Sequence, residues 1–167
     1  AAHFAADIAA RASNDLATGR SVTALRIEGV APSVADRTDA LRNVLRPFGA
    51  PDVFGEAQSR ALWEAVRDAV PFRADGPAGN AIVWRLSVAP TKGAVAARLI
   101  AQRADAAFLY DWAGGLVWAA LAPTDDVGAA AVHGAIASCG GHATLIRAPA
   151  ALRASVAAFE PQSGGLG

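Results

Sequence analysis

The sequence predicts an α+β fold: an antiparallel-dominated, ferredoxin-like sheet with its helices packed on one face. Segments of period two and of period 3.6 follow one another in the order β-αα-β-α-ββ-α-β. The pair Gly114-Gly115 lies between two apolar runs, which is typical of a tight hairpin between antiparallel strands. Each strand is apolar on mainly one side, which favours a sheet with one open face. A parallel sheet would also fit the alternation of strands and helices, but the hairpin argues against it.

The strongest strand signal covers residues 81–89, where side chains of two kinds alternate. Similar alternation predicts strands at residues 21–28, 106–112, 116–122 and 142–147. In the first two strands, the side that we expect beneath the helices carries Leu25, Ile27, Ile82, Trp84 and Leu86. Arg85 and Ser87 therefore lie on the opposite side.

Apolar residues at helical spacing predict helices at residues 2–12, 33–46, 56–69, 91–104, 124–139 and 151–159. Ser33 is expected to cap the second of these helices and Thr91 the fourth. Residues 14–19 and 73–80 are expected to be loops. Residues 1–160 should form a single domain, and residues 161–167 a flexible tail.

The composition is that of a globular chain. Its 167 residues are 53% hydrophobic and 18% charged, and its 15 basic and 15 acidic side chains cancel. This balance gives no reason to expect a nucleic-acid partner. Residues 127–146 carry no charged side chain, but their glycines and histidines are not typical of a membrane span. No methionine occurs, so we expect the chain to be a piece of a longer protein.

No self-contained catalytic apparatus is recognisable in the sequence. The pair Gly140-Gly141 precedes a strand and not a helix, so it is not a phosphate-binding loop. The single cysteine, Cys139, and three scattered histidines lack the spacing of a metal site. No Gly-x-Ser-x-Gly nucleophile motif occurs. Catalytic and cofactor-binding residues therefore stay unassigned, and no metal is expected.

The glycine pair at residues 140–141 leads into the strand that begins with His142. Glycines allow a tight turn and a close approach of two backbones. A histidine at the start of such a strand can present its ring to a ligand. A solvated or structurally hydrogen-bonded histidine is the alternative, which the chemistry alone favours.

The polar sides of the predicted strands define an open face of the sheet. It collects Arg26, Glu28, Arg85, Ser87, Asp111, His142 and Thr144. Trp112 and Trp118 lie at or near the hairpin, although tryptophans are more often core residues and the register of Trp118 is open. Such a face is typical of a surface that meets a ligand or another domain. A solvated face with incidental charges is the alternative.

Four sequence blocks together resemble one family. In chain order they are Leu62-Trp63-Glu64-Ala65-Val66-Arg67, Val83-Trp84-Arg85-Leu86-Ser87-Val88-Ala89-Pro90, Tyr110-Asp111-Trp112-Ala113-Gly114-Gly115-Leu116-Val117-Trp118 and Gly140-Gly141-His142-Ala143-Thr144-Leu145. Over about residues 20–147 the chain resembles the C-terminal half of the FAD-binding E subunit of bacterial glycolate oxidase. That subunit is similar to the vanillyl-alcohol oxidase-type flavoproteins, whose C-terminal cap domain is an α+β sheet that covers the flavin ring.

The resemblance implies a cap domain within an FAD-dependent complex that oxidises glycolate, a small 2-hydroxy acid, to glyoxylate. The implied partners are the subunit's own N-terminal FAD-binding domain, a paralogous flavin subunit and an iron–sulfur subunit. The implied location is cytoplasmic, with no membrane span, and allows association with the inner membrane through the complex. The FAD-binding half and the family's C-terminal Phe-Asn-Pro-Gly-Arg segment are missing. FAD is therefore expected in the intact subunit, whereas this fragment alone should be colourless and inactive.

The resemblance adds substrate- or flavin-facing candidates, which are Arg85, Ser87, Asp111, His142 and Thr144. The planar fork of Arg85 suits a carboxylate, and His142 could donate to a hydroxyl or accept its proton. Ser87 and Asp111 would orient them. In the competing account, Arg85 pairs with Asp111 and stabilises only an interdomain contact. The alternative function is a stand-alone ferredoxin-like module that binds a ligand or a protein without flavin.

Overall fold

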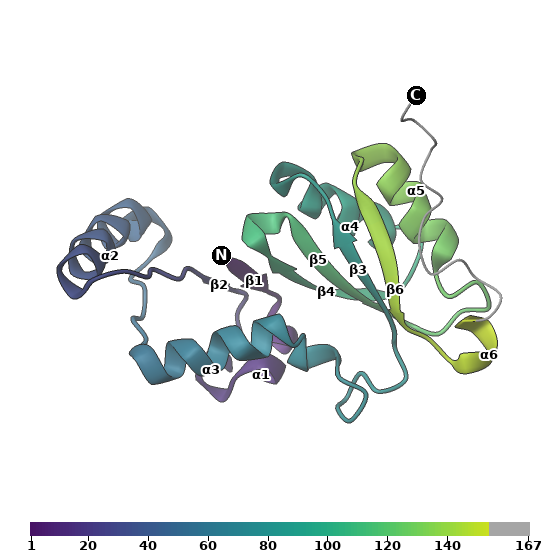
Figure 1. Cartoon of the computed structure of the whole chain (residues 1–167), viewed down its shortest axis with the longest axis horizontal. Coiled ribbons are helices and arrows are strands. Elements are labelled where there is room, and N and C mark those ends of the chain that lie inside the picture. Colours follow the sequence, from purple (N-terminus) through teal and green to yellow (C-terminus); the bar gives the residue numbers. More distant parts are fainter. Residues whose placement is uncertain (154–167) are drawn as a thin grey trace.

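A computed structural model describes residues 1–153 and contains a six-stranded antiparallel sheet in the order β2-β1-β4-β5-β3-β6 (Figure 1). The strands are β1 Ala2–Phe4, β2 Val22–Ala24, β3 Ile82–Ser87, β4 Ala106–Asp111, β5 Leu116–Leu121 and β6 His142–Arg147. The helices are α1 Ala6–Ala12, α2 Ala31–Leu45, α3 Glu56–Arg67, α4 Gly93–Ala101, α5 Ala129–Cys139 and α6 Ala150–Arg153. The predicted α+β class is confirmed. The predicted tail and most of the predicted helix at 151–159 lie outside the described residues.

Strands β3 to β6 form a ferredoxin-like unit. Their chain order is β3-α4-β4-β5-α5-β6, and their order across the sheet is β4-β5-β3-β6. Because β5 is antiparallel to both β3 and β4, these two strands are parallel to each other with β5 between them. This is the split βαβ arrangement that defines the ferredoxin-like topology. The first 80 residues add β1 and β2 to the β4 edge of this unit.

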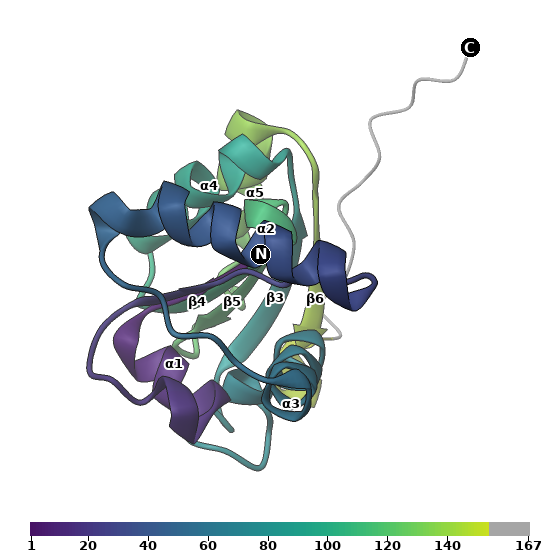
Figure 2. The same ribbon diagram turned by 90° about the vertical axis from the view of Figure 1, so that its left-hand side faces the viewer.

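One face of the sheet, here called the covered face, packs against α4 and α5 (Figure 2). Ile82, Trp84 and Leu86 lie on this face and are fully buried, as the alternation predicts. Trp84 donates its indole N–H to the carbonyl oxygen of Val127 over 2.8 Å, and its ring meets the His133 ring edge-on with 5.5 Å between centroids. The indole therefore adds buried apolar area without leaving its own polar group unpaired.

Helices α1 and α3 pack against part of the opposite face (Figure 2). Val83, Leu109 and Ala120 of the sheet form a second core there with Leu62 and Val66 of α3. The helices thus lie on both faces, which corrects the expectation that they share one. The physical reason is the amphipathic pattern of α3, whose apolar stripe needs a surface to bury and finds it on the side that α4 and α5 leave free.

The two N-terminal strands are shorter than the sequence pattern predicts. Residues 2–4 form β1 and not the start of a helix, because they alternate buried and exposed and pair with β4. β2 ends at Ala24, since the three-residue β1 offers no partner beyond it. Leu25 is 44% exposed and Ile27 is half-buried outside the strands. Their expected place beneath the helices is therefore wrong.

Helix α2 projects from one end of the molecule (Figure 1). It begins at Ala31 with Val30 at the N-cap, so Ser33 lies inside the first turn and does not cap the helix. Thr91 likewise lies in a 3-10 turn before α4 and makes no side-chain cap. No residue of α2 is buried, and Phe48 just beyond it is 87% exposed. This helix therefore adds little to the core.

The loop at residues 73–81 is held to the sheet by Arg147 of β6. The guanidinium donates to the carbonyl oxygens of Phe72 at 2.7 Å and Ala81 at 3.1 Å, and also to that of Ala78. Desolvation lowers the pKa of Arg147 from its ordinary value. Three carbonyl partners compensate for part of that desolvation, so the loop has a fixed position relative to β6.

Candidate functional site

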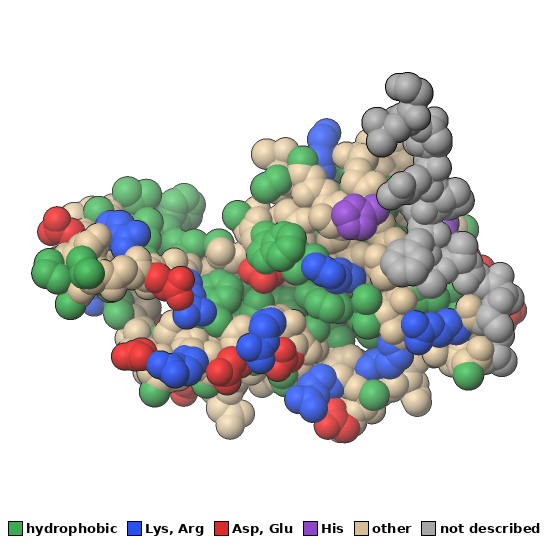
Figure 3. Space-filling view, in the orientation of Figure 1, with side chains coloured by type: hydrophobic (Ala, Val, Ile, Leu, Met, Phe, Trp, Pro, Cys, Tyr) green, Lys and Arg blue, Asp and Glu red, His purple; other side chains and the backbone are tan. Residues whose placement is uncertain are grey.

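The part of the sheet that α1 and α3 leave uncovered, opposite α4 and α5, is here called the open face. Arg85 of β3 lies directly opposite Trp118 of β5 and Thr144 of β6. Ser87 lies opposite His142 in the next row. Directly paired residues point to the same side of a sheet, so these five side chains share the open face. Figure 3 shows this side of the molecule, where basic and hydrophobic side chains lie next to each other near a histidine.

Arg85 has an unusual setting in the middle of the open face. Its guanidinium carbon lies over the rings of Trp112 and Trp118, 5.9 Å from each ring centroid. Cations at this range from an indole are stabilised by about 0.5–2 kcal/mol. Within residues 1–153, Arg85 forms no ion pair. The positive charge therefore has aromatic neighbours but no anionic partner in the described part of the chain.

Asp111 does not have the predicted role of orienting Arg85 and His142. Its carboxylate accepts the N–H of Trp112 at 2.7 Å and caps the 3-10 turn Trp112–Gly114. It lies opposite Leu116, and three strand spacings separate β4 from β6, which amounts to about 14 Å. Asp111 is therefore too far from His142 to orient it, and it forms no ion pair with Arg85. Pairing of Arg85 with Asp111 is not observed in the described part of the chain.

Arg26 and Glu28 do not lie on the open face, contrary to the prediction. Because β2 ends at Ala24, both residues lie in the connection to α2, where they form an ion pair with each other. Arg37 of α2 also donates to the carbonyl oxygen of Glu28. The sequence placed them on the face only because it extended the strand to residue 28.

The β4–β5 turn holds Trp112 beside Arg85 through an unusual backbone. Trp112 and Ala113 have φ angles of 50° and 56°, which is the left-handed region that residues with a Cβ rarely adopt. The N–H of Ala113 donates to the carbonyl oxygen of Ala1 at 3.1 Å. A Cβ on Gly114 would lie 2.7 Å from the carbonyl oxygen of Pro90, so this position needs glycine. Such strain costs about 1–3 kcal/mol per residue and is typical of functional sites.

The glycine pair before His142 has the predicted role of close backbone approach. A Cβ on Gly141 would lie 2.1 Å from the carbonyl oxygen of Ser87, and the φ of this glycine is 98°. The bare backbone thus lets the chain enter β6 directly beside the end of β3. His142 is exposed there and lies next to Ser87, although no hydrogen bond joins their side chains.

Trp112 and Trp118 complete the site, although the sequence placed them only at or near the hairpin and left the side of Trp118 open. Both lie in the β4–β5 hairpin, whereas tryptophans are in general more often found in the core. The available signal was the turn itself, where a large aromatic residue precedes Ala113 and two glycines.

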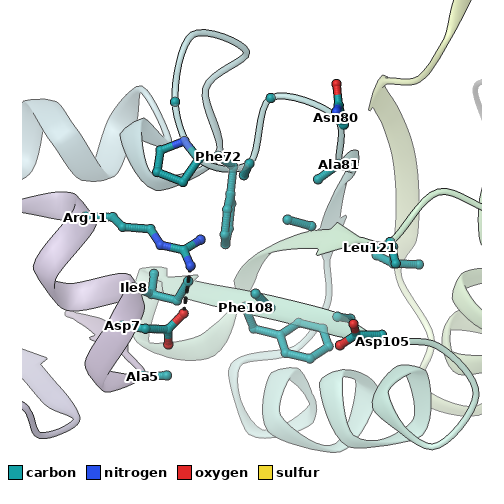
Figure 4. A pocket seen from close by; sticks show the side chains of 18 of the residues that line it. Ala5, Asp7, Ile8, Arg11, Phe72, Asn80, Ala81, Asp105, Phe108 and Leu121 are labelled. Carbon is teal, nitrogen blue, oxygen red and sulfur yellow. Dashed lines mark ion pairs between the residues drawn. The ribbon is translucent and has the colours of Figure 1, made fainter.

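A large hollow lies elsewhere, between α1, the loop at 73–81 and the edge of β4. Its volume is about 900 Å³. Figure 4 shows Phe72 and Phe108 on two sides of it and the Arg11–Asp7 ion pair, 3.2 Å long, at one end. Tyr110 also lines it, and burial raises the pKa of this phenol. None of the five predicted site residues lines this hollow.

The chemistry that the open face can support is recognition of an anion. It offers one guanidinium, two indoles, two hydroxyls and an exposed imidazole. No group of acidic, histidine or cysteine side chains in the described part of the chain could hold a metal ion. Among residues 1–153, no helix is long and apolar enough to cross a membrane.

Comparison with known proteins adds no identification. No family model, no curated protein and no solved structure matches this chain.

Proposed function

We propose that the open face is the substrate- and flavin-facing surface of a cap domain in an FAD-dependent complex that oxidises glycolate or a related 2-hydroxy acid. The observation that supports this proposal best is Arg85. It is an exposed cation at the centre of a sheet face, over two indole rings, without an acidic partner among residues 1–153. A cation held in this way is suited to an anionic ligand that lies between this domain and another.

Different side chains of the open face would bind different groups of a 2-hydroxy acid. Arg85 would receive the carboxylate, because its planar fork offers two parallel N–H donors. The hydroxyls of Ser87 and Thr144 would hydrogen-bond the ligand from the neighbouring positions. His142 is the group on this face that could accept the proton of the substrate hydroxyl.

The same face also suits a flat heterocycle. Trp118 is half-buried and Ile146 is 40% exposed, so apolar surface lies beside the hydroxyls of Ser87 and Thr144. Ile146 and the part of the face next to it would hold the flavin ring of the intact subunit, beside the acid at Arg85. When bound, the flavin would supply the redox centre of the reaction. Binding and orientation of the acid, and acceptance of the hydroxyl proton, would fall to Arg85 and His142.

The second candidate function is a ferredoxin-like module that binds a ligand or a protein without flavin. The exposed apolar side chains on and around α2 favour it. Val30, Val44, Phe48 and Val53 are all more than half exposed. Clusters of exposed apolar residues on a projecting helix are typical of protein-binding surfaces.

Substitutions in the complete complex test the first function. Arg85→Ala and His142→Ala should each lower glycolate turnover by about 100-fold, because each removes a group that contacts the substrate. Assembly and flavin content should stay unchanged. Arg98→Ala is the matched control, since Arg98 is an exposed arginine of α4, the helix beyond the covered face.

Two other outcomes have clear meanings. Loss of assembly in Arg85→Ala would indicate that Arg85 stabilises a domain contact and does not bind the substrate. Unchanged kinetics in both variants would contradict the proposal and place the chemistry in the paralogous subunit.

A further inference from the structure

We propose that Arg85, Trp112 and Trp118, here called the arginine–indole cluster, bind a carboxylate that carries an aromatic or other flat apolar group. The acid recognised by this chain would then be larger than glycolate. This inference specifies the substrate class of the proposed function more narrowly. It rests on the proposed function in one respect, namely that Arg85 binds the carboxylate.

The charge balance around the cluster favours an anionic ligand with a single charge. Six other arginines form ion pairs with Asp or Glu in the described part of the chain, whereas Arg85 forms none. The carboxylate of Asp111, at the end of β4, is used to cap the turn at Trp112. Arg147 donates to three backbone carbonyls at the edge of the sheet. The centre of the open face therefore has a single available guanidinium, which matches a monoanion better than a doubly charged phosphate.

The position of the two indoles favours a flat apolar group next to the carboxylate. The guanidinium carbon of Arg85 lies at the same 5.9 Å from both ring centroids, so any anion that reaches Arg85 comes close to both rings. A glycolate ion would occupy only the guanidinium and leave the indoles in water. An acid with an aromatic group would use both, since ring–ring contacts are attractive beyond the apolar area that they bury.

The conformation of Trp112 has a cost in folding free energy. This side chain is 58% exposed, and its backbone has a φ of 50°. A large indole left in water on a strained backbone contributes less to folding than the same residue in the core. The turn is fixed from outside itself by the Ala113 hydrogen bond to Ala1 and by the close packing of Gly114 on Pro90. The surrounding structure thus holds the exposed face of Trp112 in place for a flat group.

The test uses the indole N–H signals of the purified chain in proton–nitrogen NMR. The probes are phenyllactate, glycolate and 2-phenylethanol, which together separate the aromatic group from the carboxylate. Phenyllactate should shift the Trp112 and Trp118 signals in a saturable way and bind at least 10-fold more tightly than either other probe. The Trp84 signal should not move, because its N–H is bonded to Val127 inside the core.

Variants locate the binding and check the fold in the same spectra. Arg85→Gln should weaken phenyllactate binding at least 10-fold, and Trp112→Leu should reduce it to the level of glycolate. Arg98→Gln should leave it unchanged. In each variant, an unshifted Trp84 signal shows that the covered face is intact.

The outcomes distinguish this inference from the proposed function. Equal affinity for glycolate and phenyllactate, or phenyllactate shifts that survive in Arg85→Gln, would overturn the inference. Glycolate turnover that depends on Arg85 in the complete complex would in those cases still support the proposed function. If phenyllactate binds as expected but the complex oxidises no 2-hydroxy acid, the inference stands and the proposed function fails.

Discussion

Trp84 and Trp112 show how differently the two faces of one sheet use the same side chain. Trp84, on the covered face, has no exposed surface and a paired N–H. Trp112, beside the open face, is 58% exposed and has a left-handed backbone. Burial of the Trp84 indole stabilises the fold. The exposed Trp112 indole contributes less to stability but lies next to Arg85. We infer that the covered face carries stability and that the open face is free to carry recognition.

Truncation of the two tryptophans should give the largest difference between the covered face and the open face. Trp84→Ala should lower the free energy of unfolding by about 3–5 kcal/mol, because it leaves a large cavity and an unpaired carbonyl at Val127. Trp112→Ala should change it by about 1 kcal/mol or less, since most of that side chain is already in water. Urea denaturation followed by circular dichroism measures both. Similar losses in the two variants would mean that the faces do not differ as described.

Substitutions in the glycine pair before β6 should give a second, smaller difference in stability. Gly141→Ala should cost about 2–3 kcal/mol, because the new Cβ would lie 2.1 Å from the carbonyl oxygen of Ser87 on a backbone with a φ of 98°. Gly140→Ala is the matched control. Its φ of 75° and ψ of 174° are essentially restricted to glycine, but nothing lies within 4 Å of its Cβ position, so this variant has the backbone penalty of about 1–3 kcal/mol without the clash with β3 and should lose less than Gly141→Ala.

Thermal unfolding of the two glycine variants separates the effects. A loss in Gly140→Ala as large as that in Gly141→Ala would show that backbone conformation, and not close approach to β3, explains the pair.

The covered face was predictable from the sequence because long strands repeat their signal. The last four of the six residues of β3 alternate between buried and more exposed side chains, so the sides of Trp84 and Arg85 follow directly from the pleat. β1 and β2 have only three residues each, which is too few for the pattern to show where a strand starts or stops. The misplacement of Leu25, Arg26 and Glu28 has this single cause.

The candidate site was predictable only in part, for a related reason. Arg85, Ser87, His142 and Thr144 come together because they lie on long strands whose faces the alternation identifies. The contact of Arg85 with Trp112 depends on the shape of the β4–β5 turn. Two consecutive non-glycine residues with positive φ are rare, so the sequence could not predict that turn or the role of its tryptophan.

A third prediction concerns α5, one of the two helices over the covered face. Asp126 accepts the N–H groups of Gly128 at 3.0 Å and Ala130 at 3.1 Å before and within the first turn of this helix. These bonds, chiefly that from Ala130, lower the pKa of the Asp126 carboxyl below its ordinary value of 3.8. Asp126→Ala should therefore cost about 1 kcal/mol at neutral pH.

The pH dependence of that loss has a definite sign. A carboxyl whose pKa is lower in the folded state stabilises the protein above its unfolded pKa, and this stabilisation disappears as the pH falls through the folded value. The difference in stability between the parent and Asp126→Ala should thus be constant near neutral pH and shrink below about pH 4. Urea titrations at several pH values measure it. A difference that persists at the lowest pH would contradict the role of the ionised carboxylate.

The smallest effect is expected at the centre of the open face. Arg85→Ala removes an exposed side chain whose contacts with Trp112 and Trp118 contribute roughly 0.5 kcal/mol each, and the freed indoles gain exposure to a similar small extent. The free energy of unfolding should therefore change by less than about 1 kcal/mol. The indole signals of Trp112 and Trp118 should shift while that of Trp84 stays fixed, because only the first two lose a neighbouring cation. A large loss of stability in this variant would mean that the arginine–indole cluster holds the β4–β5 turn in place, and that the open face carries part of the stability assigned above to the covered one.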